Sequence, residues 1–247
     1  MLHVIPSGER YHVENDWLST YWHFSFDHYR DPKNISFGPL RVFNDDVVAP
    51  AGGFPLHPHR EMEIVTYLIE GQLEHRDTMG NRGVITAGEV QRMTAGTGVR
   101  HSEFNPSDQK PAHLIQLWLL PAKQGLTPSW EQKSYPRAER SGKLLPIAVP
   151  AGSANRPEYA VEVHQDATMY TSLLGPGQSI THTFSPGRRG YVFVVGGELQ
   201  VNGKTLKTGD QARISGEPTL KLAGPPEAGP KNSGSSAPAD FLFLDLP

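Results

Sequence analysis

The sequence predicts an all-β protein made of two similar modules, and three observations support that prediction. Its 25 glycines and 22 prolines are spread between short apolar runs, a composition typical of many strands joined by turns. Sustained helical periodicity is scarce. Residues 67–71 resemble residues 193–197, and a second similarity, between residues 87–89 and 208–210, follows in the same order.

Seven runs of apolar or alternating residues predict strands. They cover residues 65–69, 113–120, 159–164, 168–174, 191–195, 199–201 and 241–246. Asn202 and Gly203 predict a type I′ hairpin turn, because both residue types tolerate the positive φ angles of that turn. Residues 129–132 predict one helical turn at most. Residues 224–240 predict a flexible loop, because almost nothing in them can be buried.

The repeat and the composition together predict the domain organisation. Residues 1–132 and 157–247 form the two modules, and residues 133–156, rich in proline, glycine and lysine, form a linker. Because two fused modules already cover each other's faces, a monomer is expected.

Composition excludes several classes of function. Charges are nearly balanced, with 23 Lys and Arg against 26 Asp and Glu, so direct binding to nucleic acid or to a charged membrane surface is disfavoured. The chain has no cysteine, which excludes disulfides and thiolate metal sites. The sequence shows neither a secretion signal nor an apolar stretch of the ~20 residues needed to span a bilayer. A cytoplasmic location is therefore expected.

Two short motifs predict a metal site. His57 and His59 flank Pro58, and His101 stands two residues before Glu103. Side chains at positions i and i+2 of a strand share one face, so each motif can present two ligands on the same side. Pro58 keeps its segment extended and cannot donate to a sheet, which favours an edge strand. Three imidazoles and one carboxylate suit a divalent ion that keeps coordination positions open for chemistry.

The local pattern does not decide which carboxylate binds the ion. Glu61 and Glu63 have the same strand parity as His57 and His59, so both are alternatives to Glu103. Only the pairing register between strands can separate them.

The second module lacks these ligands. Counting from its repeated glycine places Thr183 and Ser185 where the first two histidines stand, and Leu222 and Gly224 where His101 and Glu103 stand. His182 lies near the vacant position, but a lone histidine without converging partners is more simply an ordinary polar residue. One metal site per chain is predicted.

The stretch from Phe54 to Asn105, FPLHPHREMEIVTYLIEG through GTGVRHSEFN, closely resembles the signature of the pirin family. Residues 88–105 are also similar to the second motif of cupins generally. The similarity continues at residues 117–121, 163–166 and 181–183, and is greatest to the short bacterial pirin-like quercetinases. It implies two tandem cupin barrels packed as a bicupin, the second without metal ligands.

Residue by residue, the resemblance implies that His57, His59, His101 and Glu103 bind the metal. Cupins in general place the carboxylate where Glu63 lies, so Glu63 is expected to line the pocket or to neighbour the ligands. The resemblance also implies one divalent ion per chain, with Fe²⁺ expected first and Mn, Ni, Cu or Zn as alternatives.

The activity implied by the resemblance is that of a quercetin 2,3-dioxygenase, which opens a flavonol ring with O₂ and releases carbon monoxide. Glu103 would then be the general base as well as a ligand. A small aromatic substrate needs an apolar pocket. Candidates to line it are Phe54, Met62, Met93 and Trp118. Candidates to hydrogen-bond the ligands are Gln116 and His113.

Two other functions compete with this one. Pirins are also non-enzymatic regulators, so the chain could be a metal-binding or redox-sensing protein that acts through a protein partner and offers a sizeable surface patch. A cupin isomerase acting on sugars would need more Arg, Lys and Tyr near the metal. Arg60, Arg92 and Arg100 keep that class open.

Overall fold

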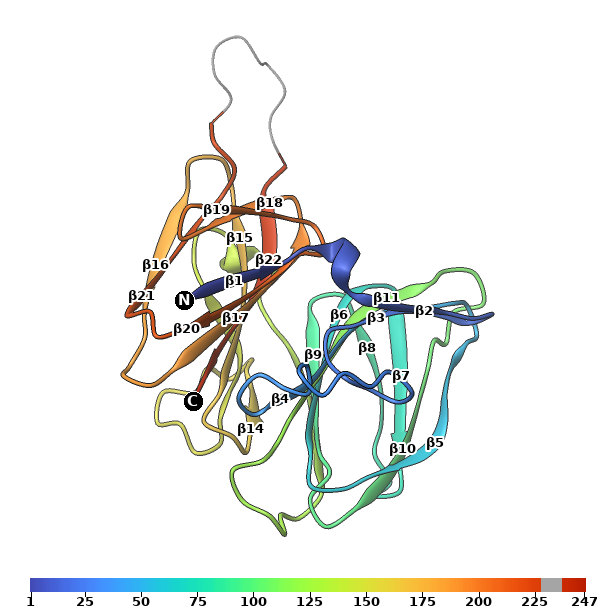
Figure 1. Cartoon of the computed structure of the whole chain (residues 1–247). Helices are drawn as coiled ribbons and strands as arrows, with labels where there is room; N and C mark the ends of the chain where they lie inside the picture. The colour runs from blue at the N-terminus through green and yellow to red at the C-terminus, as the bar shows by residue number, and fades with distance from the viewer. Residues whose placement is uncertain (228–236) are drawn as a thin grey trace. The chain divides into compact units, whose positions relative to one another are not determined.

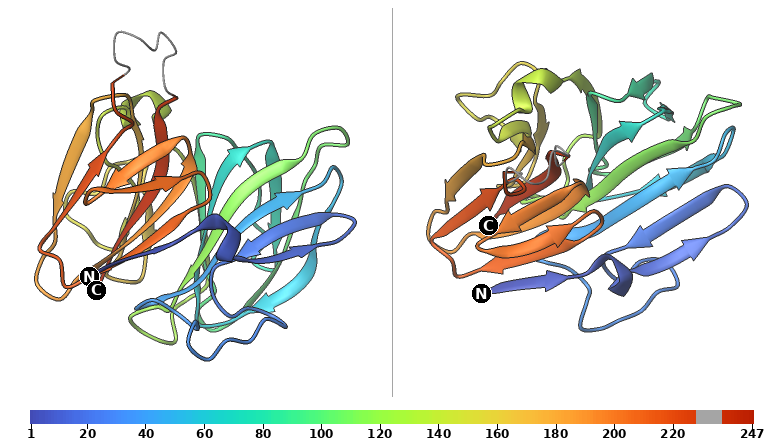
Figure 2. Two further views of the ribbon diagram at one scale, coloured as in Figure 1. Left: turned by 45° about the horizontal axis from the view of Figure 1, so that its top comes forward. Right: turned by 90° about the horizontal axis from the view of Figure 1, so that it is seen from above.

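The computed structural model (Figure 1) describes residues 1–227 and 237–247. Most of the predicted 224–240 loop therefore lies outside the described residues. By its internal contacts the chain forms two compact units. Unit 1 comprises Met1–Arg10, Pro136–Ile147 and Ala167–Pro247, and unit 2 comprises Tyr11–Tyr135 and Ala148–Asp166. Both termini belong to unit 1 (Figure 2).

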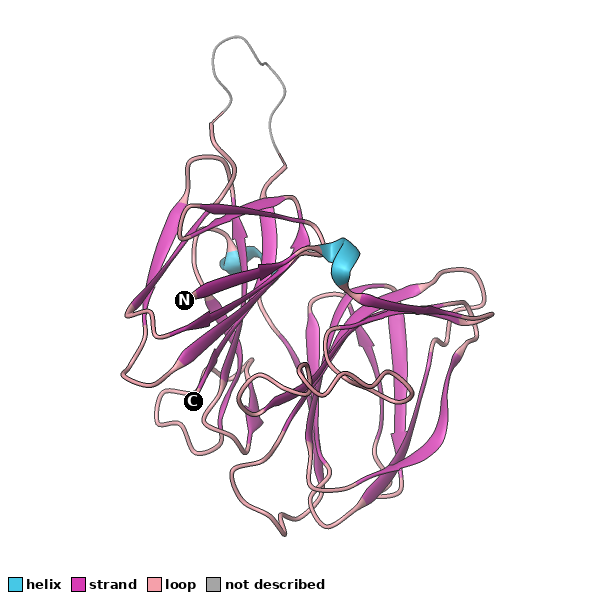
Figure 3. Ribbon diagram, in the orientation of Figure 1, coloured by secondary structure: helices cyan, strands magenta, loops and turns pink. Residues whose placement is uncertain are grey.

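Strands make up nearly all of the secondary structure (Figure 3). The helical segments of the described chain are two short 3₁₀ helices, η1 (Ser7–Glu9) and η2 (Arg137–Arg140). Across residues 1–227 and 237–247, no helix has the length and apolar character needed to cross a membrane. The prediction of an all-β fold is confirmed.

Unit 2 is built from two antiparallel sheets. The larger has the order β12-β9-β6-β11-β4-β3-β2, and the smaller has the order β5-β10-β7-β8. The strands of the larger sheet are β2 (Tyr11–Glu14), β3 (Leu18–Trp22), β4 (Leu40–Val48), β6 (Glu63–Glu70), β9 (Glu89–Thr94), β11 (Ala112–Leu119) and β12 (Ser129–Ser134). Those of the smaller sheet are β5 (Gly53–His59), β7 (Gln72–Asp77), β8 (Arg82–Thr86) and β10 (Val99–Phe104). Side chains from both sheets, among them Leu68, Leu73, Ile85 and Leu114, meet in one buried cluster, which is the barrel core.

Unit 1 repeats this strand order. Its two sheets run β1-β20-β17-β22-β15-β13 and β16-β21-β18-β19. The strands are β1 (Leu2–Ile5), β13 (Leu145–Pro150), β15 (Thr168–Leu174), β16 (Ser179–Thr183), β17 (Arg189–Gly196), β18 (Glu198–Val201), β19 (Lys204–Lys207), β20 (Gln211–Ser215), β21 (Thr219–Ala223) and β22 (Ala239–Leu246). The order β5-β10-β7-β8 of unit 2 corresponds strand for strand to β16-β21-β18-β19, so the two modules share one topology. The short similarities in the sequence therefore mark a true structural repeat.

The contact units interleave along the chain, whereas the predicted modules follow one another. The N-terminal strand β1 pairs with β20 and so belongs to unit 1. The last three residues of β13 pair in parallel with β14 (Val161–Val163), and both lie in unit 2. The limits 1–132, 133–156 and 157–247 stay a prediction about the folding modules.

Most predicted strands are found within one or two residues of their expected ends. Asn202 and Gly203 have φ angles of 47° and 80° in the turn between β18 and β19, as a type I′ turn requires. The helical turn expected at residues 129–132 is wrong, because this segment pairs with β9 as strand β12. The strand expected at 159–164 is limited to the three residues of β14.

Candidate metal centre

The histidines of the two predicted motifs lie on neighbouring strands of the smaller sheet in unit 2. β5 is an edge strand of that sheet, as Pro58 predicts, and it lies beside β10 (Figure 1). The pairing of the two strands places His57 opposite His101. The Nε2 atoms of these two rings are 3.0 Å apart. Metal–imidazole bonds are ~2.1 Å long, so one ion can bind both nitrogens.

His59 completes the cluster. One ligand atom each from His57, His59 and His101 lies within 4.8 Å of the others. The Nε2 atom of His59 is buried and has no hydrogen-bond partner among the described residues. A buried polar atom without a partner is costly in a native protein, and a bound cation would supply the missing interaction. The three imidazoles therefore fit a divalent metal.

Burial keeps two of these rings, His59 and His101, neutral, which is the form that binds metals. The pKa of His59 is lowered to about 3, mainly by burial and in addition by the neighbouring rings of His101 and His57. Burial likewise lowers the pKa of His101 to about 3, with His57 and His75 contributing. Both side chains are thus prepared as ligands at neutral pH.

These low pKa values predict that the metal-free protein loses stability on acidification. The unfolded chain takes up protons on these histidines near pH 6.5, whereas the folded chain does so only near pH 3, so stability falls as the pH drops through this window. At pH 5 each ring would account for the loss of up to about 2 kcal/mol in the free energy of unfolding. Urea unfolding of chelator-treated protein at pH 7 and pH 5 measures the loss. His59→Leu should show a smaller loss, and an equal one would contradict the assignment.

Glu103 lies on β10, two residues beyond His101, and lines the same cavity as His57 and His59. Among the groups of ligand atoms that could hold a metal, it is grouped with His75 and His101. Its side chain is 1 % exposed, and the pairing of β10 with β5 shifts register between His101 and Glu103. Gln91 Nε2 donates to its Oε1 at 3.1 Å, and Gln116 Nε2 donates to its Oε2 at 2.7 Å. Each amide bond leaves the oxygen a further lone pair. Glu103 is therefore oriented by the barrel and still able to bind a cation or to accept a proton.

Gln116 makes the expected kind of hydrogen bond, to Glu103, and His113 does not. Gln116 accepts a hydrogen bond from Trp118 Nε1 at 3.1 Å while donating to Glu103. His113 instead lies 2.7 Å from the carboxylate of Asp45. The side chains of Gln116 and His113 point to opposite faces of the sheet, because an odd number of positions separates them on β11. Gln91 was missed, because β9 was not predicted as a strand.

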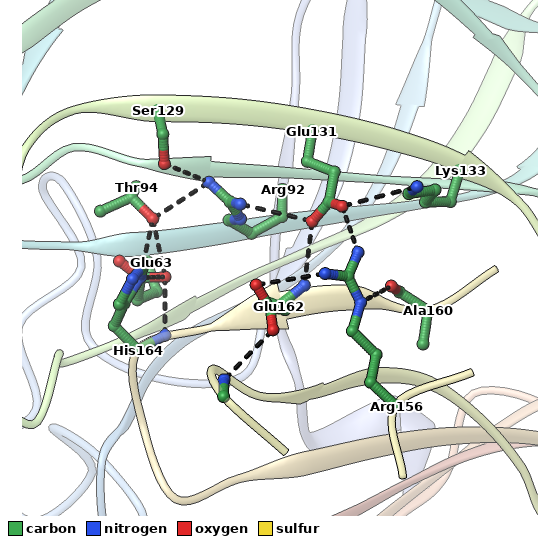
Figure 4. A network of polar contacts seen from close by, with 11 residues as sticks. Glu63, Arg92, Thr94, Ser129, Glu131, Lys133, Arg156, Ala160, Glu162 and His164 are labelled. Carbon is green, nitrogen blue, oxygen red and sulfur yellow. Dashed lines mark hydrogen bonds and ion pairs between the residues drawn. The ribbon is translucent and has the colours of Figure 1, made fainter. Parts of the chain in front are cut away.

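Glu63 does not lie with the metal ligands, so the expectation that it lines the pocket or competes with Glu103 is wrong. Its Oε2 accepts hydrogen bonds from Thr94 Oγ1 and from the His164 backbone, each at 3.0 Å (Figure 4). Thr94 pairs directly with Glu63 and lies an odd number of residues from Gln91 on the same strand. Thr94, and Glu63 beside it, therefore lie on the opposite face of the sheet from Gln91, which contacts Glu103.

The parity argument for Glu61 and Glu63 fails at the turn after His59. Glu61 has a φ of 49°, in the left-handed region, and reverses the chain between β5 and β6. β5 and β6 belong to different sheets, so side-chain alternation does not carry across. The carboxylate of Glu61 accepts from the Gly125 backbone in a loop.

The outer face that carries Glu63 is covered by residues 148–166 of the same unit. Arg156 forms ion pairs with Glu131 and Glu162, and Arg92 binds Glu131 at 3.3 Å (Figure 4). Glu131 also accepts from the Glu162 backbone at 3.0 Å. The end of the predicted linker, at Arg156, thus packs against the barrel through ion pairs. The contacts of this face account for Oε2 of Glu63, whereas its Oε1 is buried without a hydrogen-bond partner among the described residues.

A cavity of about 570 Å³ opens beside the histidines. It is lined by Val13, Asn15, Trp17, Leu18, Trp22, Phe26, Asp27, His28, Asn44, Asp46, Phe54, Pro55, His57, His59, Glu103, Gln116 and Trp118. Of the expected lining residues, Phe54 and Trp118 are among these. Met93 is buried in the barrel core, and Met62 lines a neighbouring cavity. The cavity is mostly apolar and aromatic, with a few polar groups, as in sites for small molecules.

Two polar residues of this cavity were not anticipated. Asn44 and Asp46 share a face of β4, and Asn44 pairs directly with Gln116. The Oδ1 atom of Asn44 is buried and has no hydrogen-bond partner within the described chain. Burial raises the pKa of Asp46 to about 7, with the nearby charges of Asp45 and Glu103 adding to the rise. The sequence signal was the polar run at 44–46 inside an apolar strand.

Unit 1 offers no equivalent site among its described residues. β21, which corresponds to β10, carries Leu220 and Leu222 at the inward positions, and both are fully buried. His182 lies 2.7 Å from Asp245 and is absent from the described groups of ligand atoms that could hold a metal. Leucine side chains fill the interior that histidines line in unit 2.

Comparisons with known proteins agree with this description. Residues 6–119 match the family model described as Pirin, and residues 151–229 match the one described as Quercetinase C-terminal cupin domain. A quercetin 2,3-dioxygenase of Escherichia coli K12 is 39 % identical over 247 residues, which are 100 % of this chain and 99 % of that protein. A pirin-like protein of Caulobacter vibrioides is 39 % identical over 210 residues, covering 85 % of this chain and 89 % of that protein.

A solved structure gives the same result. The bacterial pirin YhhW from Escherichia coli in complex with nickel(II) matches with a TM-score of 0.88 and 35 % identity, covering 100 % of this chain and 99 % of that one. The matches extend over both cupin modules and include the barrel that carries the histidine cluster. The chain is therefore a bicupin and belongs to the pirin family.

Proposed function

We propose that the chain is a metal-dependent dioxygenase that opens the ring of a flavonol-like substrate with O₂ and releases carbon monoxide. The observation that carries this proposal is the convergence of three imidazoles at the wall of an aromatic-lined cavity that also contains a carboxylate. The name of the Escherichia coli relative, quercetin 2,3-dioxygenase, supports the same reaction class.

His57, His59, His101 and Glu103 would hold the ion in this proposal. When bound, a divalent ion supplies a Lewis acid that stabilises a deprotonated substrate hydroxyl. The nitrogen and oxygen donors, without any thiolate, suit Fe²⁺, which we propose as the resident metal, with Ni²⁺ as the principal competitor. The nickel complex of the related YhhW supports the competitor.

Glu103 would accept the proton of the substrate hydroxyl. Its two oxygens are held by Gln91 and Gln116, so the carboxylate cannot turn away from the cavity without breaking both bonds. A positioned base of this kind typically contributes 10²- to 10⁴-fold to a rate. Glu103 is itself buried, and a low-dielectric surrounding strengthens the interaction between the carboxylate and the hydroxyl.

The cavity walls favour a flat aromatic substrate over a sugar. Trp22, Phe26 and Trp118 contact one another edge to face, with ring centroids 5.2 and 5.3 Å apart, and Trp118 packs against His59. Within the described residues, the lining of this cavity contains no Arg, Lys or Tyr. Arg92 is bound on the outer face, and Arg60 and Arg100 line a second cavity that shares His59 with the first. The lining of the larger, aromatic cavity is what favours a flavonol over a sugar.

Asn44 is expected to recognise a ring hydroxyl of the substrate. Its unpaired Oδ1 would accept a hydrogen bond that leucine cannot accept, and such a bond is worth about 1 kcal/mol or somewhat more. We expect Asn44→Leu to lower kcat/KM for quercetin about tenfold. The reaction of 3-hydroxyflavone, which lacks the other ring hydroxyls, should change much less. Equal losses for both substrates would contradict a specific contact.

The proposed reaction is tested directly with purified protein. Its metal content is measured first, and chelated protein is then loaded separately with Fe²⁺, Ni²⁺, Mn²⁺, Cu²⁺ or Zn²⁺ and incubated aerobically with quercetin. We expect loss of the flavonol absorbance together with release of carbon monoxide. Absence of ring cleavage with every metal would overturn the dioxygenase proposal and favour the regulatory alternative. The cytoplasmic location and the monomeric state stay predictions.

A further inference from the structure

A third pair of polar side chains with i, i+2 spacing lies behind the metal cluster. His75 and Asp77 are on β7, which pairs with β10 so that Asp77 is opposite His101. His75 Nδ1 is 3.3 Å from His101 Nδ1, and His75 Nε2 is 3.1 Å from Asp77 Oδ2. The side chains of His75 and Asp77 are inaccessible to solvent. The His75 ring also stacks on Trp130, with centroids 5.5 Å apart.

The far end of this chain of contacts is an ionised carboxylate. Oδ1 of Asp77 accepts from the backbone amides of Met79 and Asn81, and Oδ2 accepts from the Asn81 side chain at 2.9 Å. Burial alone would raise the pKa of Asp77, but the hydrogen bonds from Asn81, His75 and Met79 outweigh it and lower the pKa. Asp77 is therefore an acceptor only.

The positions of the protons on the His75 and His101 rings follow from the acceptor role of Asp77. Because Asp77 only accepts, a neutral His75 ring carries its proton on Nε2, which leaves a lone pair on Nδ1. That lone pair can accept only if His101 carries its proton on Nδ1. The Nε2 atom of His101, which faces His57, then has a lone pair available for a metal.

His57 reaches the same state by a separate contact. Its Nδ1 lies 2.8 Å from the carbonyl oxygen of Pro55, which can only accept, so the proton is on Nδ1 and Nε2 has a lone pair. The Nε2 atoms of His57 and His101 thus direct two lone pairs at each other across 3.0 Å. Such an arrangement is repulsive unless a cation lies between them.

We propose that His75 and Asp77 are positioning residues that fix the Nδ1–H tautomer of His101 and so hold its Nε2 ready for the metal. This inference rests on the metal centre of the proposed function but not on the dioxygenase reaction. In metal sites, groups behind a ligand histidine commonly set its tautomer and change metal affinity by 10- to 100-fold. The inference also excludes His75 as a ligand, although one of its ring nitrogens lies within 4.8 Å of a ring nitrogen of His101 and of a carboxylate oxygen of Glu103.

Long-range ¹H–¹⁵N correlation of the histidine rings tests the assignment in the wild-type protein. With diamagnetic Zn²⁺ bound, His75 should show an Nε2–H tautomer and no metal-bound nitrogen, and His101 should show Nδ1–H with Nε2 bound. A proton on Nδ1 of His75, or a metal-bound His75 nitrogen, would overturn the proposal. The result does not depend on whether quercetin is cleaved.

Asp77→Asn gives a second and independent test. The backbone amides of Met79 and Asn81 should keep donating to the side-chain oxygen of the new asparagine, so that its NH₂ group faces His75. This group would donate to His75 Nε2 and so reverse the tautomers of His75 and His101. We expect the affinity for Ni²⁺ to fall 10- to 100-fold, with a changed His75 tautomer in the NMR spectrum. Unchanged affinity and tautomer would sink the idea.

Glu74→Gln on the same strand is the matched control, since it makes the same chemical change at a carboxylate that binds Arg76 and Arg82 instead of the cluster. It should leave Ni²⁺ affinity unchanged. Thermal unfolding of both metal-free variants separates a loss of folding from a loss of affinity, because only the latter leaves the apo transition intact. If Glu74→Gln weakened Ni²⁺ binding as much as Asp77→Asn, the tautomer explanation would be overturned.

Discussion

Replacing His101 with alanine is expected to weaken divalent-metal binding roughly 100- to 1,000-fold. Site binding energies of about 10–16 kcal/mol spread over four ligands correspond to about 2.5–4 kcal/mol for each, and this value sets the expected loss. His101 is central to the cluster, because it faces His57 at 3.0 Å and His75 lies behind it. Its removal deletes one ligand and leaves the imidazoles of His57 and His59 more exposed to solvent.

Equilibrium dialysis against Ni²⁺ or Fe²⁺, with metal analysis of the retained protein, measures this effect. His182→Ala is the matched control, because His182 lies in unit 1 against Asp245 and away from any described cluster of ligand atoms. It should retain the stoichiometry of one ion per chain. A His101→Ala protein that still binds one ion with wild-type affinity would show that the metal centre is wrongly assigned.

Glu103→Gln is expected to lower the turnover of a flavonol by 10²- to 10⁴-fold while the protein stays folded. The amide preserves the shape of the side chain but cannot accept a proton as a base, and it binds a cation more weakly than a carboxylate does. Gln91 and Gln116 each donate to one oxygen of Glu103. In the variant, an NH₂ group replaces one of these oxygens and therefore faces another donor. Metal affinity should fall as well, by less than turnover.

Glu63→Gln provides the matched comparison on the other face of the sheet. Glutamine can still accept from Thr94 and from the His164 backbone, so folding should be retained and both turnover and metal content should stay near wild type. Steady-state rates with quercetin and metal analysis of both variants decide the question. If the Glu63 variant alone lost its metal, the assignment of Glu103 would be refuted.

Much of the fold is predictable from short-range patterns. Strand β15 has the bounds that its apolar run predicts, and the Asn202-Gly203 turn has the expected φ angles, because both depend on neighbouring residues only. Residues 129–132 were misjudged, since their strand conformation depends on pairing with β9, thirty-five or more residues away in the chain. The polar pair His75 and Asp77 has the same i, i+2 spacing as the two recognised motifs, which was the signal for it.

The sequence by itself determined that the chain is a two-module all-β protein with a histidine cluster in the first module, because strand alternation places residues at i and i+2 on one face. Only the tertiary structure decided which carboxylate lines the cavity beside that cluster. Glu61 reverses the chain after β5, and the pairing of β6 with β9 turns Glu63 to the outer face, while β10 brings Glu103 beside the histidines. Register between distant strands depends on packing of the whole barrel, and no local pattern records it.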